Sequence, residues 1–207
     1  RDICEAYKQE FSRQTLFEML KLDLLVGSGG VLSHAPRRSQ AFLMMIDAFQ
    51  PEGITRLAVD SIFMMPHLGV LSTVNEQAAT EVFVKDCLIH LGTCVSLVKG
   101  SIGKFKEKCI SYKIMMPDGK KIEESLPYGD LRVFPLGIDQ SAEIEIVPAK
   151  NFDVGSGRGK PMTKRVFGGV VGIVIDTRGR PITLAKEKVS RVEQVQRWTK
   201  AIDAYPE

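Results

Sequence analysis

Apolar runs and helical spacing alternate over the first sixty residues. An apolar run over residues 22–26 ends at a glycine-rich turn and predicts a buried strand. Residues 38–49 carry apolar side chains at helical spacing, and residues 55–60 form a second short apolar run. The order strand, turn, helix, strand is typical of a βαβ unit, so we expect the two strands to pair in parallel.

Helical spacing continues on both sides of this unit. Residues 2–20 place apolar side chains on one face of a predicted helix. Leu68, Leu71 and Val74 mark another predicted helix after the second strand.

After about residue 85 the pattern changes to short strands separated by turns. Residues 109–115 and 121–125 flank a Pro-Asp-Gly-Lys turn, in which Pro presets the first backbone angle and Gly supplies a positive φ. They predict a hairpin. Alternating apolar residues and Glu over residues 142–146 predict a strand with one face in water. The other predicted elements are a strand at 131–134, a strand pair or bulged strand at 166–175, and an amphipathic helix at 188–204.

Composition places the chain among ordinary globular proteins. It has 207 residues, of which 44% are hydrophobic and 26% charged. A formal net charge of +3 is too small to indicate a nucleic-acid or membrane partner, and no stretch approaches the roughly 18 apolar residues of a membrane span. The predicted fold class is therefore α/β plus β, with an α/β segment over residues 1–98 and a β-rich segment with a C-terminal helix over residues 99–207.

Cysteine and histidine give no metal or catalytic signature. The spacings of Cys4, Cys87, Cys94 and Cys109 fit no zinc pattern, and we expect reduced, buried thiols. The three histidines are far apart in sequence and have no acid at metal-ligand spacing. No nucleophile elbow is present, so we assign no catalytic residue and no metal ligand.

The strongest candidate site is the glycine turn, formed by Gly27, Ser28, Gly29 and Gly30. Glycine lets a backbone approach a ligand closely, and the N-terminus of a following helix offers free N–H groups and a positive dipole end. The turn therefore predicts a site for a nucleoside or phosphate. A tight turn without a ligand accounts for the same residues equally well, because short glycine motifs often occur by chance.

Two other glycine patterns fit their motifs less well. A dinucleotide-type enzyme, such as a dehydrogenase or methyltransferase, would use Gly27, Gly29 and the ribose acid Asp60, but Leu32 stands where the third glycine is required. The loop at residues 155–161 lacks phosphate-loop spacing and has proline in place of the Mg²⁺-holding hydroxyl, so we interpret it as a basic loop. A protein-interaction module without a ligand is the third possibility.

The glycine turn and the residues that follow it resemble the glutamate mutase L (MutL) family. The resemblance covers residues 24–36, 40–41, 53–60 and 66–71, and residues 129–131, 151–155 and 168–181 resemble the C-terminal extension of its longer members. This family is similar to actin-like ATPases. Its members act as accessory or reactivating proteins of adenosylcobalamin-dependent mutases.

The resemblance implies a partial actin-like (ribonuclease H-like) α/β segment, followed by a β-rich barrel or sandwich. It implies ATP with Mg²⁺ as cofactor, a mutase as partner and a cytoplasmic location. Gly27, Ser28, Gly29 and Gly30 would line the adenine or ribose. The family's phosphate loops and magnesium-holding acid are not found in this sequence, and the chain begins at Arg1 without a methionine. We therefore expect a C-terminal fragment that does not hydrolyse ATP by itself.

Overall fold

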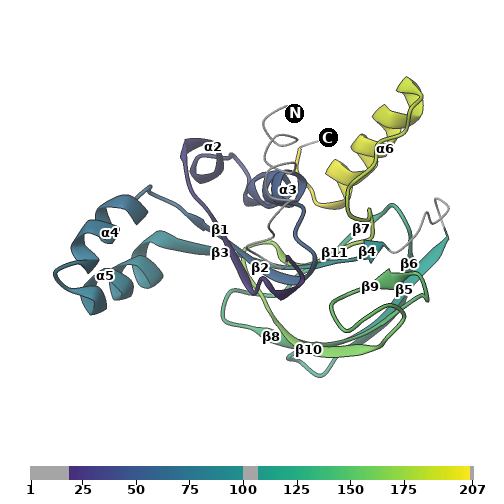
Figure 1. The fold of residues 1–207 in the computed structure, drawn as a ribbon, viewed down its shortest axis with the longest axis horizontal. Coiled ribbons are helices and arrows are strands. Elements are labelled where there is room, and N and C mark those ends of the chain that lie inside the picture. Colours follow the sequence, from purple (N-terminus) through teal and green to yellow (C-terminus); the bar gives the residue numbers. More distant parts are fainter. Residues whose placement is uncertain (1–18, 100–106, 206–207) are drawn as a thin grey trace.

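The computed structural model describes residues 19–99 and 107–205 (Figure 1). The helix predicted at residues 2–20 lies outside the described residues, except for a short 3-10 turn, η1 (Met19–Lys21). The described residues form a mixed α/β fold with β-sheets and a C-terminal helix, which confirms the predicted class at that level. None of the described helices is long and apolar enough to cross a bilayer.

The first sheet has five strands in the order β1–β2–β3–β11–β7. β1 and β2 pair in parallel, as predicted, whereas β3 is antiparallel to β2 and parallel to β11, and β7 is antiparallel to β11. The bounds are β1 Leu24–Gly27, β2 Gly53–Asp60, β3 Leu88–Ser96, β7 Leu131–Phe134 and β11 Gly172–Asp176. This sheet takes strands from both predicted segments, 1–98 and 99–207, and their separation into domains stays a prediction.

The centre of this sheet contains a close approach between two glycines. A β-bulge between Leu57 and Ala58 moves their β3 partners from Gly92 to His90. On its other side Gly92 lies opposite Gly172 of β11. Gly92 has φ +141°, and a Cβ added to it would collide with the carbonyl oxygen of Gly172. Any side chain at this position would therefore force the two central strands apart.

The second sheet has four antiparallel strands in the order β10–β8–β5–β6. The predicted hairpin is confirmed as β5–β6, and β8 alternates buried and exposed residues as predicted. The strand pair predicted over residues 166–175 is wrong, because β10 and β11 belong to different sheets. The bounds are β5 Lys108–Met115, β6 Lys121–Pro127, β8 Ser141–Pro148 and β10 Met162–Phe167, with a small pair formed by β4 Val98–Lys99 and β9 Phe152–Asp153.

The body of the molecule has three layers. Helices α3 (Arg38–Phe49) and α6 (Lys188–Ala201) lie on one side of the five-stranded sheet, and the four-stranded sheet lies on the other (Figure 1). The alternation of β11 matches this order, since Ile173 and Ile175 pack in the core between the sheets and Val174 packs with the helices. α3 has the predicted bounds. It ends because Gln50 takes a left-handed φ of +47° and Pro51 cannot continue the helix.

A buried ionic cluster joins the sheet to the helices. The carboxylate of Asp176, which is fully buried, accepts hydrogen bonds from Arg178 at 2.9 and 3.0 Å and from Arg180 at 2.8 Å. Arg178 also pairs with Asp47 of α3 at 2.8 Å and lies 4.9 Å from the ring of Trp198 in α6. Burial raises the pKa of Asp176, but the charges of Arg178 and Arg180 outweigh it and hold that pKa well below its usual range.

The connection between β2 and β3 forms an arm that projects from the layers (Figure 1). The arm comprises residues 61–87 and contains α4 (Met65–Ser72), α5 (Glu76–Val82) and the π-helical turn η2 (Phe83–Cys87). α4 confirms the helix predicted after the second strand. Asn75 caps α5 by accepting a hydrogen bond from the Ala78 amide at 3.0 Å. The arm thus has a defined helical hairpin structure of its own.

The described cysteines are free, buried thiols, as predicted. Burial raises the pKa of Cys94 to about 11 and that of Cys109 to about 12, and it also raises the pKa of Cys87. Such thiols are protonated at pH 8 and are poor nucleophiles. Because Cys4 lies outside the described residues, we expect a Cys4→Ser variant to show no reaction with a disulfide dye when native and to titrate three thiols in denaturant. Reaction of any thiol before unfolding would contradict the burial.

Candidate functional site

The glycine turn lies at the carboxyl edge of the parallel strand pair. Gly27 is the last residue of β1 and lies opposite Val59, so the turn comes next to the end of β2 at Asp60. A Cβ on Gly27 would lie 2.6 Å from a terminal methyl group of Leu32, so a larger residue there would require this side chain to move. Gly29 has φ +108°, a conformation that side chains disfavour. Ligands of open α/β sheets commonly bind at this edge.

An open cavity of about 530 Å³ lies beside the turn. It is lined by backbone and side-chain atoms of Gly29, Gly30, Ser33, His34, Ser61, Ile62 and Phe63. Two of the four predicted residues, Gly29 and Gly30, therefore line the cavity. Gly27 packs beneath it, and Ser28 is turned toward Asp60.

Asp60 is a structural acceptor in this arrangement. It is fully buried and accepts hydrogen bonds from Ser28 Oγ at 3.2 Å and from the amides of Met64 and Met65 at 3.1 and 2.9 Å. Burial raises the pKa of Asp60, but these hydrogen bonds outweigh it and place the pKa below its ordinary value. The carboxylate is thus already engaged, which argues against its expected role as a ribose acceptor in a dinucleotide enzyme.

A short helix that the sequence did not predict lies directly behind the turn. It is α2 (Gly30–Ser33), a single turn, and the longer helix α3 begins only at Arg38. The amides of Leu32 and Ser33 donate to the carbonyl oxygen of Gly29, and Ser33 Oγ donates to the same oxygen. A single turn carries little dipole, so the positive end of a long helix, which the sequence analysis counted in favour of the site, is not found directly behind this turn.

Phe63 is a site residue that the sequence did not reveal. It has φ +57°, which is an outlier for a bulky side chain, and it remains 52% exposed at the cavity. Its neighbour Ile62 is also exposed there. Strained residues of this kind often occur at ligand sites. Together they add apolar, partly aromatic surface to the lining of the cavity, which suits the flat face of a base.

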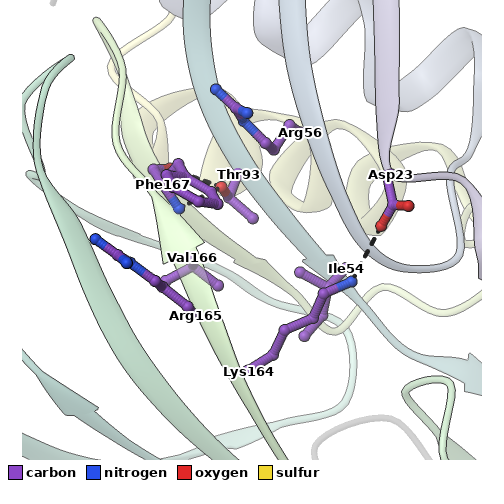
Figure 2. A pocket seen from close by; sticks show the side chains of 8 residues that line it. All are labelled: Asp23, Ile54, Arg56, Thr93, Lys164, Arg165, Val166 and Phe167. Atoms are coloured by element: carbon purple, nitrogen blue, oxygen red, sulfur yellow. Dashed lines mark hydrogen bonds and ion pairs between the residues drawn. The ribbon is translucent and has the colours of Figure 1, made fainter.

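A second cavity, of about 200 Å³, opens between β2, β3 and β10 (Figure 2). Lys164 pairs with Asp23 at 3.3 Å, and the guanidinium carbons of Arg56 and Arg165 lie 4.5 and 5.6 Å from the ring centre of Phe167. Asp23 is the one acid among its lining residues, so the lining carries an excess of positive charge. This cavity suits a small anion and lacks the glycine backbone of the first cavity.

The basic loop at residues 155–161 is closed around a side chain. Asp153 Oδ1 accepts hydrogen bonds from the amides of Gly155 and Gly157 at 2.7 and 2.9 Å. Gly159 donates its amide to the carbonyl oxygen of Phe152 at 2.9 Å. These three amides are therefore occupied and do not form an open phosphate cradle, in line with the earlier rejection of a phosphate loop here.

Among the described residues, neither cavity is lined by a cluster of side chains that could bind a metal ion. In the part of the chain that the structure describes, no cluster of three or more His, Cys, Asp or Glu residues could hold an ion. The lining of the cavity at the glycine turn contains no carboxylate. The residues present therefore fit a nucleoside, and Mg²⁺ of an ATP complex would need ligands other than these lining residues.

Comparison with known proteins gives one match. A protein-family model described as MutL protein matches residues 5–87. The matched range includes the glycine turn, Asp60 and the arm, and it ends directly before β3. No curated protein and no solved structure matches the chain. The resemblance of residues 129–181 to the family's C-terminal extension lies outside the match and stays a prediction.

Proposed function

We propose that this chain, whose residues 5–87 belong to the MutL (glutamate mutase L) family, is the C-terminal portion of an ATP-binding accessory or reactivating protein for an adenosylcobalamin-dependent mutase. The supporting observation is that Gly29, Gly30 and the half-exposed Phe63 line one open cavity at the glycine turn. We assign residues 19–87 to one half of an actin-like ATPase fold. The proposed place of action is the cytoplasm, where ATP is available.

In this proposal the chain supplies the adenosine side of the ATP site. Glycines 29 and 30 let the ribose approach the backbone, and the base lies against Phe63 and Ile62. The polar side chains at the cavity are Ser33, Ser61 and His34. The Ser33 and Ser61 hydroxyls already donate to the carbonyl oxygens of Gly29 and Cys87, so they can only accept hydrogen bonds from a ligand. The phosphates and Mg²⁺ require a second wall, so we expect adenosine contacts without ATP hydrolysis by these residues.

The same contacts offer a route from ligand to partner. Ser28 of the glycine turn donates to Asp60, and Asp60 accepts from the first amides of α4 in the arm. A ligand that shifts the turn would change this hydrogen-bonded joint and bias the position of the arm. We propose that the accessory role uses this bias, because a ligand can act at a distance only through states that it binds differently.

A substitution at Gly30 tests the nucleoside site. A Cβ at Gly30 would meet only His34 at 3.8 Å, and no positive φ is required, so Gly30→Glu adds a carboxylate to the cavity with little strain. We expect its affinity for ATP and for adenosine to fall at least about tenfold, because the side chain occupies the cavity and repels phosphate. Calorimetric titration measures both ligands.

Gly69→Glu is the matched control. Gly69 lies in α4 with open space around it and does not line the cavity, so the same change of charge should leave nucleotide affinity unaltered. Equal affinity of the wild-type protein and Gly30→Glu for both ligands would remove the nucleoside site from the proposal.

The other candidate functions have distinct signatures. A thermal shift with S-adenosylmethionine or NAD, absent with ATP, would favour a dinucleotide-type or methyltransferase enzyme. No shift with any nucleotide, together with binding to a mutase, would favour a pure interaction module. The exposed apolar surface of the arm is the observation that favours an interaction module.

A further inference from the structure

The arm combines a small core with several exposed apolar side chains. Its own core consists of Leu68, Ala79 and Cys87, supported by the partly buried Met64 and Phe83. Outside the nucleoside cavity it exposes five large aliphatic side chains: Val70 (71%), Leu71 (40%), Val74 (86%), Val82 (37%) and Val84 (53%). Scattered exposed apolar residues are normal, but a concentration on one projecting hairpin marks an interaction surface.

The C-terminal helix α6 carries a second exposed apolar surface. The C-terminal part of α6 is fixed to the core, because Trp198 and Ile202, which directly follows the helix, are both buried. The Trp198 indole also donates a hydrogen bond to the carbonyl oxygen of Gly129 at 2.7 Å. Toward its start, α6 exposes Val189 (62%), Val192 (48%) and Val195 (39%). These residues recur every third position and form a stripe along one side of a rigidly held helix.

Charge distinguishes the two surfaces. Over residues 61–87 the arm has three acidic side chains and one basic side chain: Glu76, Glu81, Asp86 and Lys85. Over residues 186–201 the helix region has five basic and two acidic side chains: Lys186, Lys188, Arg191, Arg197 and Lys200, with Glu187 and Glu193. Arg197 is paired with Asp130 at 2.9 Å, and the other basic side chains still outnumber the two acidic ones. The apolar hairpin is therefore acidic, and the apolar stripe is basic, which favours their contact over contact of either surface with itself.

The two surfaces belong to distant parts of one molecule. The arm and α6 extend from opposite ends of the molecule in Figure 1. They cannot meet within one chain without unfolding the layers between them. We propose that the arm of one copy receives α6 of a second copy, in a helix-in-groove contact that joins the copies head to tail.

Charge-reversing variants of each surface test this contact. Val74→Lys places a positive charge on the acidic arm, and Val192→Glu places a negative charge on the basic helix, both at exposed positions. We expect the wild-type chain to self-associate with rising concentration in sedimentation velocity, and each variant to associate at least about tenfold more weakly because like charges then oppose each other. Val147→Glu, at a 43% exposed position of β8, is the matched control and should associate like the wild type.

Mixing the two variants separates this proposal from its competitors. In the mixture, the Val192→Glu chain has an unaltered arm and the Val74→Lys chain has an unaltered α6. The arm of the first can bind the helix of the second, so we expect dimers in the mixture but not in either variant alone. A wild-type chain that stays monomeric over the concentration range would overturn the proposal, as would a mixture that fails to dimerise. Full association of Val192→Glu by itself would show arm-to-arm pairing and overturn it as well. Thermal melts confirm that each variant is folded.

This contact is independent of the proposed nucleoside site. None of the substituted residues lines the cavity at the glycine turn. At concentrations where the wild type is also monomeric, the nucleotide affinity of the variants should therefore equal that of the wild type, and failure of one proposal leaves the other standing.

Discussion

Replacing Asp176 by Asn is expected to lower the free energy of unfolding by about 3–5 kcal/mol. The fully buried carboxylate neutralises Arg178 and Arg180, which are 2% and 6% exposed, and accepts hydrogen bonds from both. The amide removes the negative charge and leaves two buried guanidinium groups with less compensation. Urea unfolding at pH 7, followed by the fluorescence of Trp198 next to Arg178, measures the loss.

Asp47→Asn is the control for this cluster. Asp47 pairs with the same guanidinium of Arg178, but its side chain is 49% exposed. Because water screens such a pair, we expect a loss of about 1 kcal/mol or less. Similar losses of unfolding free energy in Asp47→Asn and Asp176→Asn would show that burial does not determine how much each carboxylate contributes to stability.

Acid should reduce the difference between Asp176→Asn and the wild type. The pKa of Asp176 lies below its unfolded value in the folded protein, so its contribution to stability is complete at neutral pH. That contribution is lost as the pH falls below about 4, where the unfolded carboxyl binds a proton. Asp176→Asn lacks this carboxyl group, so its free energy of unfolding should approach that of the wild type in acid. A difference between the two proteins that stays constant from neutral to strongly acidic pH would contradict the lowered pKa of Asp176.

Gly92→Ala is expected to destabilise the protein by at least about 3 kcal/mol, because steric overlap and an unfavourable φ act together. The added methyl group would collide with the backbone of Gly172 in the neighbouring strand. Backbone atoms on both sides belong to the central strands of the sheet, so neither can move without breaking ladder hydrogen bonds. Chemical denaturation with an unchanged m-value would give the size of the effect.

Gly119→Ala separates the two causes. Gly119 also has a positive φ, of +84°, but no atom lies within 4 Å of its virtual Cβ in the β5–β6 turn. We therefore expect only the backbone cost, about 1–2 kcal/mol. If both variants lost the same free energy, steric overlap at Gly92 would play no part.

Local patterns predicted the elements that depend on local signals. Helix α3 was predicted at its observed bounds, because apolar spacing and the following proline both define it. The β5–β6 hairpin followed from its turn residues. Strand β3 was not predicted, because Gly92, Thr93 and Ser96 interrupt its apolar pattern. Their partners, such as the Phe167 backbone for Thr93 Oγ1 at 2.6 Å, come from distant parts of the chain.

The candidate site shows the same limit. Residues 29 and 30 could be found from the sequence, because glycines clustered at the end of an apolar run indicate a tight turn with an open backbone. Phe63 could not be found, since nothing local predicts a positive φ at phenylalanine. Asp60 had a ligand role only in the alternative of a dinucleotide-type enzyme, and its contacts with Ser28 and the first amides of α4 are structural. Whether a carboxylate binds a ligand or stabilises the fold depends on its hydrogen-bond partners in space, which sequence spacing does not reveal.

The position of β11 between β3 and β7 has a consequence for synthesis of the protein. A ribosome delivers β3 long before residues 172–176, which supply its second neighbour. Until then the nascent chain presents an apolar ribbon with one open edge, the kind of surface that aggregates or recruits a chaperone. A translation stop or a protease cut ahead of Gly172 would therefore leave a chain prone to precipitation, even though residues 5–87 would be intact.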